Sequence, residues 1–136
     1  MRLLGVDFGG TRIGLATVDS ETRLPRPVGV LVASGSLAKD AAAIKAEADK
    51  EQATNIVVGL PLDLDGETRM SRVCRMLGDQ LTALGLAVDF VDESMTSQAA
   101  EAAMERAGMK ASRARKRVDA EAACRILERY LGEHGP

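Results

Sequence analysis

Carboxylates at three places along the chain suit chemistry on phosphate groups. Asp7 lies near the end of an apolar, strand-forming run, and Asp92 and Glu93 follow directly on a second such run. Ligand sites of α/β proteins gather at the carboxyl ends of strands. Asp119 shares one face of a predicted helix with residues at i+4, i+7 and i+11, so its carboxylate is expected to face a sheet. A folded sheet can therefore bring these carboxylates into one pocket.

Several carboxylates in one pocket repel one another unless a cation compensates their charge. Hard oxygen ligands suit Mg²⁺ or Mn²⁺, and two such ions about 3.5–4 Å apart can activate water and stabilise the leaving oxygen of a phosphodiester. Taken singly, each residue has an ordinary structural interpretation beside that of a metal ligand. Asp7 is then a residue that caps a turn, and Asp119 is a favourable charge in the first turn of a helix. Their convergence is what favours a two-ion magnesium or manganese site.

The rest of the composition argues against other chemistries. The 136-residue chain has one histidine, His134 near the C-terminal end, which disfavours a catalytic triad or a histidine-ligated zinc. Two phenylalanines, one tyrosine and no tryptophan are too few for a base-stacking platform. Cys74 and Cys124 lack metal-ligand spacing and are predicted to be buried thiols. No apolar run approaches the roughly 18 residues that span a membrane, so a soluble, cytoplasmic protein is expected.

Charge is unevenly distributed along the chain. The net charge of −2 does not suit a non-specific DNA coat, yet six basic residues and no acidic one lie between Arg106 and Arg117. This segment is interpreted either as a nucleic-acid contact or as a solvated loop without a partner. Arg12, in a predicted hairpin, is either a phosphate contact or an ordinary exposed residue. The candidate nucleic-acid-binding residues are Arg12, Lys110, Arg113, Arg115, Lys116 and Arg117.

The apolar pattern predicts the elements that position these residues. Strands are predicted at 2–7, 12–18, 27–33, 55–60 and 86–91, and helices at 37–52, 67–84, 96–107 and 116–131. Gly59–Pro61 is interpreted as a turn that either lines a substrate groove or simply connects two elements. The predicted fold is α/β and ribonuclease H-like, with three antiparallel strands followed by two parallel ones in a five-stranded mixed sheet and helices on both faces. Residues 1–136 are expected to form one such domain.

Four segments, in order, resemble the successive motifs of the YqgF/RuvX family. They are Asp7–Ala16, Val57–Pro61 with Asp65 and Gly66, Val91–Thr96, and Val118–Ala123 with Ile126, Leu127, Tyr130 and Leu131. The family has a ribonuclease H-like fold related to Holliday junction resolvases and is associated with processing the 5′ end of pre-16S ribosomal RNA. The resemblance implies that Asp7, Glu93 and Asp119 are the catalytic, metal-binding carboxylates. Asp92, by strand alternation, is expected on the other face.

The chain departs from the family pattern at two places beside the predicted site. Gly10 and Thr11 stand where the family usually has Thr-Lys, and Ser94 stands where it usually has Arg. Two cations beside the carboxylates are therefore replaced, which affects substrate-phosphate contacts and leaves the carboxylates in place.

The preferred hypothesis is a metal-dependent nuclease that hydrolyses phosphodiester bonds of RNA, as a monomer or a homodimer. One alternative is a Holliday junction resolvase or related nuclease of branched DNA, which needs a symmetric dimer with two sites. A second alternative is a non-catalytic nucleic-acid-binding factor in ribosome assembly. A phosphotransferase of the actin and sugar-kinase type also begins with an Asp-x-Gly hairpin, but it needs two such domains.

Overall fold

The structure, a computed structural model, describes residues 1–93 and 111–134, with only the backbone described for 111–118. Its elements are β1 (Arg2–Phe8), β2 (Arg12–Asp19), β3 (Arg26–Val32), α1 (Leu37–Lys50), β4 (Asn55–Pro61), α2 (Arg69–Ala83), β5 (Ala87–Glu93) and α4 (Ala111–Glu133). The helix predicted over 96–107 lies outside the described residues.

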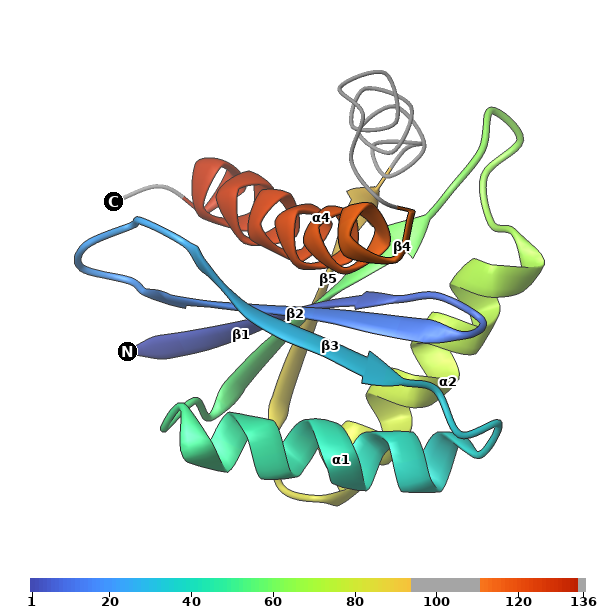
Figure 1. Ribbon diagram of the computed structural model, residues 1–136, viewed down its shortest axis with the longest axis horizontal. Helices are drawn as coiled ribbons and strands as arrows, with labels where there is room; N and C mark the ends of the chain where they lie inside the picture. Colours follow the sequence, from blue (N-terminus) through green and yellow to red (C-terminus); the bar gives the residue numbers. More distant parts are fainter. Residues whose placement is uncertain (94–110, 135–136) are drawn as a thin grey trace.

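The five strands form one mixed sheet in the order β3-β2-β1-β4-β5 (Figure 1). Strand β2 pairs antiparallel with both β1 and β3, whereas β4 pairs parallel with both β1 and β5. This arrangement confirms the predicted ribonuclease H-like sheet. Because β1, β4 and β5 run in the same direction, their carboxyl ends meet at one edge of the sheet.

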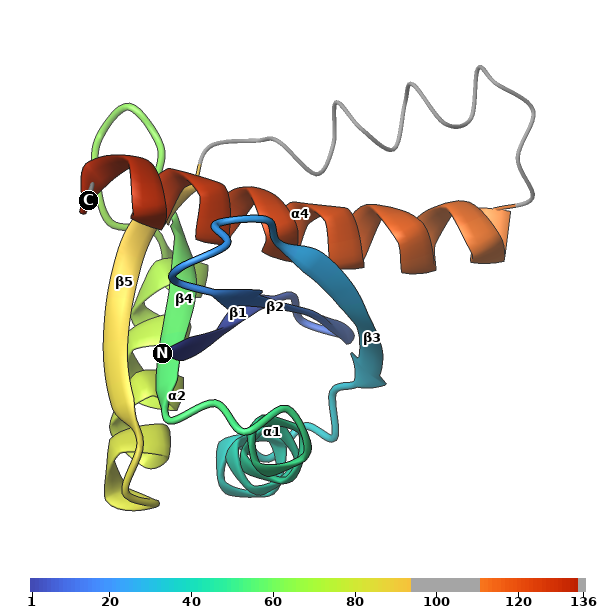
Figure 2. The ribbon, with the colours of Figure 1, turned by 90° about the vertical axis from the view of Figure 1, so that its left-hand side faces the viewer.

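Helices cover both faces of the sheet, with α4 on one face and α1 and α2 on the other (Figure 2). Strand alternation sends successive side chains to opposite faces. On β1, Leu4, Val6 and Phe8 join the apolar core under α1 and α2. Leu3 packs under α4, and by the same alternation Asp7 faces α4.

Glycines on three neighbouring strands let α4 lie close to the sheet. A Cβ added at Gly14 on β2 would collide with the backbone of Asp119, and one added at Gly59 on β4 would lie 2.6 Å from Ile126 Cδ1. Gly5 on β1 is equally tight against α4. A glycine inside a strand commonly marks such a close approach.

Local hydrogen bonds and one glycine set the ends of α1 and α2. The Ser36 side chain accepts a hydrogen bond from the Lys39 N–H at the start of α1, and Thr68 and Ser71 form a reciprocal capping box at the start of α2. Gly85, with φ of +92°, follows the end of α2 in the left-handed conformation that glycine tolerates best.

The predicted bounds beside the site were wrong at three places. Helix α4 begins at Ala111 instead of residue 116, because Ala, Arg and Lys are good helix formers even where no apolar periodicity marks the turn. Strand β5 continues to Glu93, and Gly59–Pro61 is the end of strand β4 instead of a turn. The reason is that the β4–β5 ladder pairs these residues up to Pro61 and Glu93.

Both cysteines are free thiols, as predicted. Cys74 is buried among the apolar residues beneath α2, and burial raises its pKa to about 12. Cys124 on α4 is partly buried, and burial together with nearby glutamates raises its pKa to about 11. Neither thiol has the low pKa that makes a cysteine nucleophilic. In the described ranges, no helix is long and apolar enough to cross a membrane.

Candidate active site

Asp7 and Glu93 come together at the edge where the parallel strands end. Strand β4 lies between β1 and β5, so the two side chains must meet across it. Gly59 makes this possible, because a Cβ at that position would lie only 2.8 Å from Glu93 Oε2. Gly59 is thus a positioning residue; the sequence placed it in a turn and missed this role inside β4, although an isolated glycine within an apolar strand is a signal for it.

The contact between Asp7 and Glu93 changes the protonation of the pair. Burial, then the negative charge of Asp7, then a hydrogen bond with Asp7, raise the pKa of Glu93 to about 8. Within the described residues, the buried Glu93 Oε1 has no hydrogen-bond partner. At neutral pH the pair therefore holds a proton, and one of its oxygens is unsatisfied.

Asp119 is placed over strand β2 by an ion pair. Arg12 Nε donates a hydrogen bond to Asp119 Oδ2 at 2.6 Å, and Asp119 is 8% exposed. The backbone of Asp119 lies against Gly14, whose partner across the β1–β2 ladder is Asp7. The backbone of Asp119 therefore lies over the residue that pairs with Asp7, while the charge of its carboxylate is compensated by Arg12.

Asp92 lies on the other face of β5, as strand alternation predicts. Its neighbour Phe90 packs with the core under α2, and Arg75 of α2 lies over that ring at 5.4 Å from its centroid. The hydrogen bond and charge of Glu67 raise the pKa of Arg75, and the negative charge of Asp92 adds a smaller effect in the same direction. Asp92 consequently belongs to the α2 side and offers a matched control for Glu93.

The predicted basic surface is only partly described. Lys110 lies outside the described residues. Arg113, Arg115, Lys116 and Arg117 belong to the first turns of α4, where the structure describes the backbone alone. Their positions near the amino end of α4 precede Asp119 on the same helix.

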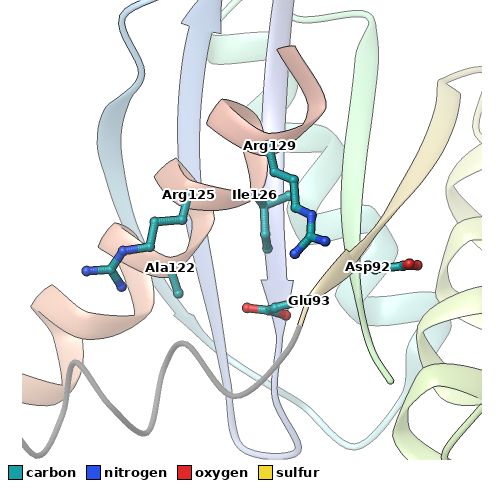
Figure 3. Close-up of a pocket in the computed structure, with 6 residues that line it drawn as sticks. All are labelled: Asp92, Glu93, Ala122, Arg125, Ile126 and Arg129. Atoms are coloured by element: carbon teal, nitrogen blue, oxygen red, sulfur yellow. The ribbon is translucent and has the colours of Figure 1, made fainter. Parts of the chain in front are cut away.

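A small pocket that opens to solvent lies between α4 and the end of β5 (Figure 3). It is lined by Asp92, Glu93, Ala122, Arg125, Ile126 and Arg129. Arg125 and Arg129 were missed from the sequence, because their one-turn spacing is ordinary on an exposed helix face. Only the packing of α4 against the sheet places them beside Glu93.

The donor atoms of the Asp7–Glu93 pair fit a hard divalent cation. Carboxylate oxygens are preferred ligands of Mg²⁺ and Mn²⁺, and a buried oxygen without a partner is a vacant acceptor for one. In the described part of the chain, no group of three carboxylates, imidazoles or thiols is close enough to hold a metal ion. The pair is therefore the core of the candidate site, and Asp119 stands apart in its ion pair with Arg12.

This fold and site define a ribonuclease H-like protein with paired carboxylates at the carboxyl end of its parallel strands. A family model described as "RuvX: Holliday junction resolvase" matches residues 1–133. The chain belongs to this family, which confirms the resemblance seen in the four motifs and supports a nuclease role.

Curated relatives share the whole length of the chain. A protein of Anaeromyxobacter dehalogenans (strain 2CP-C), named "Putative pre-16S rRNA nuclease", is 43% identical over 138 residues that cover 100% of both chains. A protein of the same name from Myxococcus xanthus (strain DK1622) is 33% identical and covers 100% of this chain and 91% of its own.

A solved structure of a more distant protein has the same fold. It is the Thermus thermophilus RuvC protein, solved "in complex with Holliday junction substrate". The TM-score is 0.56 at 19% identity, covering 99% of this chain and 96% of the RuvC chain.

Proposed function

We propose that this protein is a metal-dependent nuclease that hydrolyses phosphodiester bonds and trims the 5′ end of pre-16S ribosomal RNA in the cytoplasm. The observation that carries the proposal is the half-buried Asp7–Glu93 contact, in which the buried Glu93 Oε1 is unsatisfied. Two repelling carboxylates are costly to bury without a function that uses their charge. The names of the curated relatives support ribosomal RNA as the substrate.

Asp7 and Glu93 are assigned to hold Mg²⁺ or Mn²⁺, in a site of one or two ions. The ion, when bound, lowers the pKa of water and offsets negative charge on the phosphate. Binding requires Glu93 to give up the proton that it retains beside Asp7. Gly59, which has no side chain, leaves room for Glu93 to reach toward Asp7, and Ile126 of α4 packs over the same position.

Asp119 is assigned as the third catalytic carboxylate, oriented by Arg12. The ion pair fixes the Asp119 side chain over β2 and stabilises its charge in a buried position. Arg12 is itself partly exposed, so its guanidinium remains available to a substrate phosphate. Binding of the nucleic-acid backbone is assigned to Lys110 and to Arg113, Arg115, Lys116 and Arg117 of α4.

A cleavage assay tests the proposed chemistry. We expect Mn²⁺ or Mg²⁺ to support cleavage of single-stranded RNA, Ca²⁺ to support it poorly because of its looser coordination, and excess EDTA to abolish it. Asp7→Asn is expected to lose at least about a hundredfold in rate, whereas Asp79→Asn, an exposed position on α2 away from the site, keeps the parent rate. Full activity in EDTA would contradict a metal-dependent mechanism.

The same assay separates the alternatives when single-stranded DNA and four-way junctions are added as substrates. Selective cutting of the junction identifies a resolvase instead of an RNA-processing enzyme. Binding of RNA with no cleavage of any substrate identifies a non-catalytic assembly factor.

Thermal unfolding with Mn²⁺ tests the carboxylates without a substrate. By linkage, the parent gains about RT ln(1 + [M]/Kd), or about 2.7 kcal/mol at a hundredfold excess over Kd. Asp7→Asn is expected to lose most of this gain and Asp92→Asn to keep it. A parent-like Mn²⁺ response in Asp7→Asn would remove Asp7 from the site.

A further inference from the structure

The pocket between α4 and the end of β5 carries two arginines that the catalytic roles above do not use. Arg125 and Arg129 are exposed on α4, and Glu93 forms the inner wall of the same pocket. The cations therefore stand next to the carboxylate pair on the outer, β5 side of the sheet.

Two acidic side chains near the arginines, Asp92 and Glu133, differ in how they are placed. Asp92 lines the pocket, but its carboxylate extends away from α4 in Figure 3, toward the side where it acts on Arg75. Arg129 Nε meets Glu133 Oε1 at 3.4 Å, and both side chains are about half exposed (51% and 50%). An ion pair of this length in solvent contributes little and is easily exchanged for a stronger acceptor.

The arginines are held in a fixed relation to the carboxylate pair. The Tyr130 hydroxyl donates a hydrogen bond to Asp89 Oδ2 on β5 at 2.7 Å, which ties this part of α4 to the strand that ends in Glu93. Ile126 lies between the two arginines along the helix and is buried against Gly59. The pocket thus sits where α4 is attached to β5 and packs against β4.

The spacing of the two arginines suits an extended polyanion. Four residues of helix separate them by about 6 Å along the axis, so a strand that follows the helix passes both. Guanidinium groups bind phosphate oxygens through paired, charge-assisted hydrogen bonds. Figure 3 shows Arg129 extending toward the end of β5 and Arg125 extending past Ala122, which spreads the two cations along a path instead of a single point.

We propose that the Arg125–Arg129 pocket binds the phosphodiester backbone of the substrate strand beside the bond that is cut at Asp7 and Glu93. This inference rests on the proposed nuclease function and adds to it the path of the substrate over α4 and β5. Arg125 and Arg129 bind and position the substrate strand, and they take no part in the chemical step.

The test measures binding and cleavage separately in Arg125→Gln, Arg129→Gln and the double variant. Arg26→Gln is the matched control, because Arg26 is an exposed arginine on β3, at the opposite edge of the sheet. Binding of a short, fluorescently labelled single-stranded RNA is followed by anisotropy in EDTA, where no cleavage occurs, over a salt series from about 50 to 200 mM.

Each single variant is expected to bind about tenfold more weakly, as for the loss of one charge-assisted hydrogen bond. The slope of log affinity against log salt should fall by about 0.7 for each phosphate group that the variant no longer binds. In the cleavage assay KM should rise about as much, with kcat little changed. Arg129→Lys should keep the parent salt slope because it keeps the charge, and Arg26→Gln should behave as the parent.

The outcomes distinguish this inference from the proposed function. If the parent cuts RNA and the arginine variants keep the parent's affinity, salt slope and KM, the pocket inference is overturned and the nuclease function stands. If the parent binds RNA through the two arginines and cuts nothing, the pocket is supported and the nuclease function fails. Thermal melting of every variant confirms that it is folded, which is expected since the replaced side chains are exposed.

Discussion

The two faces of the sheet are built from the same strands and bury different residues. Toward α1 and α2 the strands place large apolar side chains, such as Leu4, Ile13 and Val58. Toward α4 they place glycines in the middle and carboxylates near the carboxyl end, with Gly59 and Glu93 on adjacent strands. Both faces bury an apolar core, but only the α4 face also has glycines that let its helix lie close and, at the edge of the sheet, carboxylates that are held near one another.

This difference shows how a small protein can fold stably although its candidate site holds two carboxylates that repel each other. The core under α1 and α2 contributes the burial that offsets the repulsion between Asp7 and Glu93 on the opposite face. Strand alternation keeps the two functions separate, because neighbouring residues on one strand never share a face. Removing an apolar side chain under α1 and α2 should therefore destabilise the protein, whereas removing the charge of one of the paired carboxylates on the α4 face should not.

The largest expected effect comes from the α1 and α2 face. Leu4 is 0% exposed, and Leu4→Ala should lower the free energy of unfolding by about 2–5 kcal/mol, the cost of lost apolar burial and of a residual cavity. Urea denaturation of the variant measures the loss. A change below about 1 kcal/mol would show that this face does not carry the stability assigned to it.

Next in size is the fit of α4 against the glycines. Gly14→Ala should destabilise the protein by about 1–3 kcal/mol, because the added methyl group collides with the backbone of Asp119. In Gly10→Ala the nearest atom, Met70 Cε, lies 3.9 Å from the added Cβ, so this control should stay within about 0.5 kcal/mol. Equal melting temperatures for the two variants would contradict the close seating of α4.

The pH dependence of stability should report the Glu93 proton. The pKa of Glu93 is raised to about 8 in the fold, so the folded state binds more protons than the unfolded state between about pH 4.5 and 8. Stability in EDTA should therefore fall as pH rises through this window, by up to about 1.4 kcal/mol per pH unit, and level off above it. Comparison with Glu93→Gln isolates this contribution, and identical pH profiles would refute it.

The smallest expected effect is a gain on the α4 face. Asp7→Asn removes the charge that helps to raise the Glu93 pKa and keeps the size of the side chain. In EDTA near pH 8, the melting temperature of this variant should equal or exceed that of the parent. The free energy of unfolding should rise by up to about 1 kcal/mol. The pH-dependent slope due to Glu93 should also shift to lower pH. A clearly lower melting temperature would show that Asp7 is chiefly a structural turn residue.

Much of the fold is readable from the sequence because its signals are local. Alternation of apolar residues marks the strands, the helical repeat of apolar residues such as Ala41 and Ile44 marks α1, and the hairpin spacing fixes the antiparallel start. The boundaries that failed lie where the local signal is weak or is overridden by pairing. Helix α4 begins in a stretch without apolar periodicity, and β5 extends into two charged residues because β4 pairs with it.

For the candidate site too, some features follow from the sequence and others only from the tertiary structure. The sequence by itself determined that carboxylates stand at strand ends and on the last helix, because residue type and alternation are properties of the chain. Only the tertiary structure decided which groups meet: Glu93 reaches toward Asp7 across Gly59, Asp119 pairs with Arg12, and Arg129 comes to lie beside Glu93. These contacts depend on how closely α4 sits against the sheet, and a side-chain distance between elements far apart in sequence has no local signature that a pattern of residues can carry.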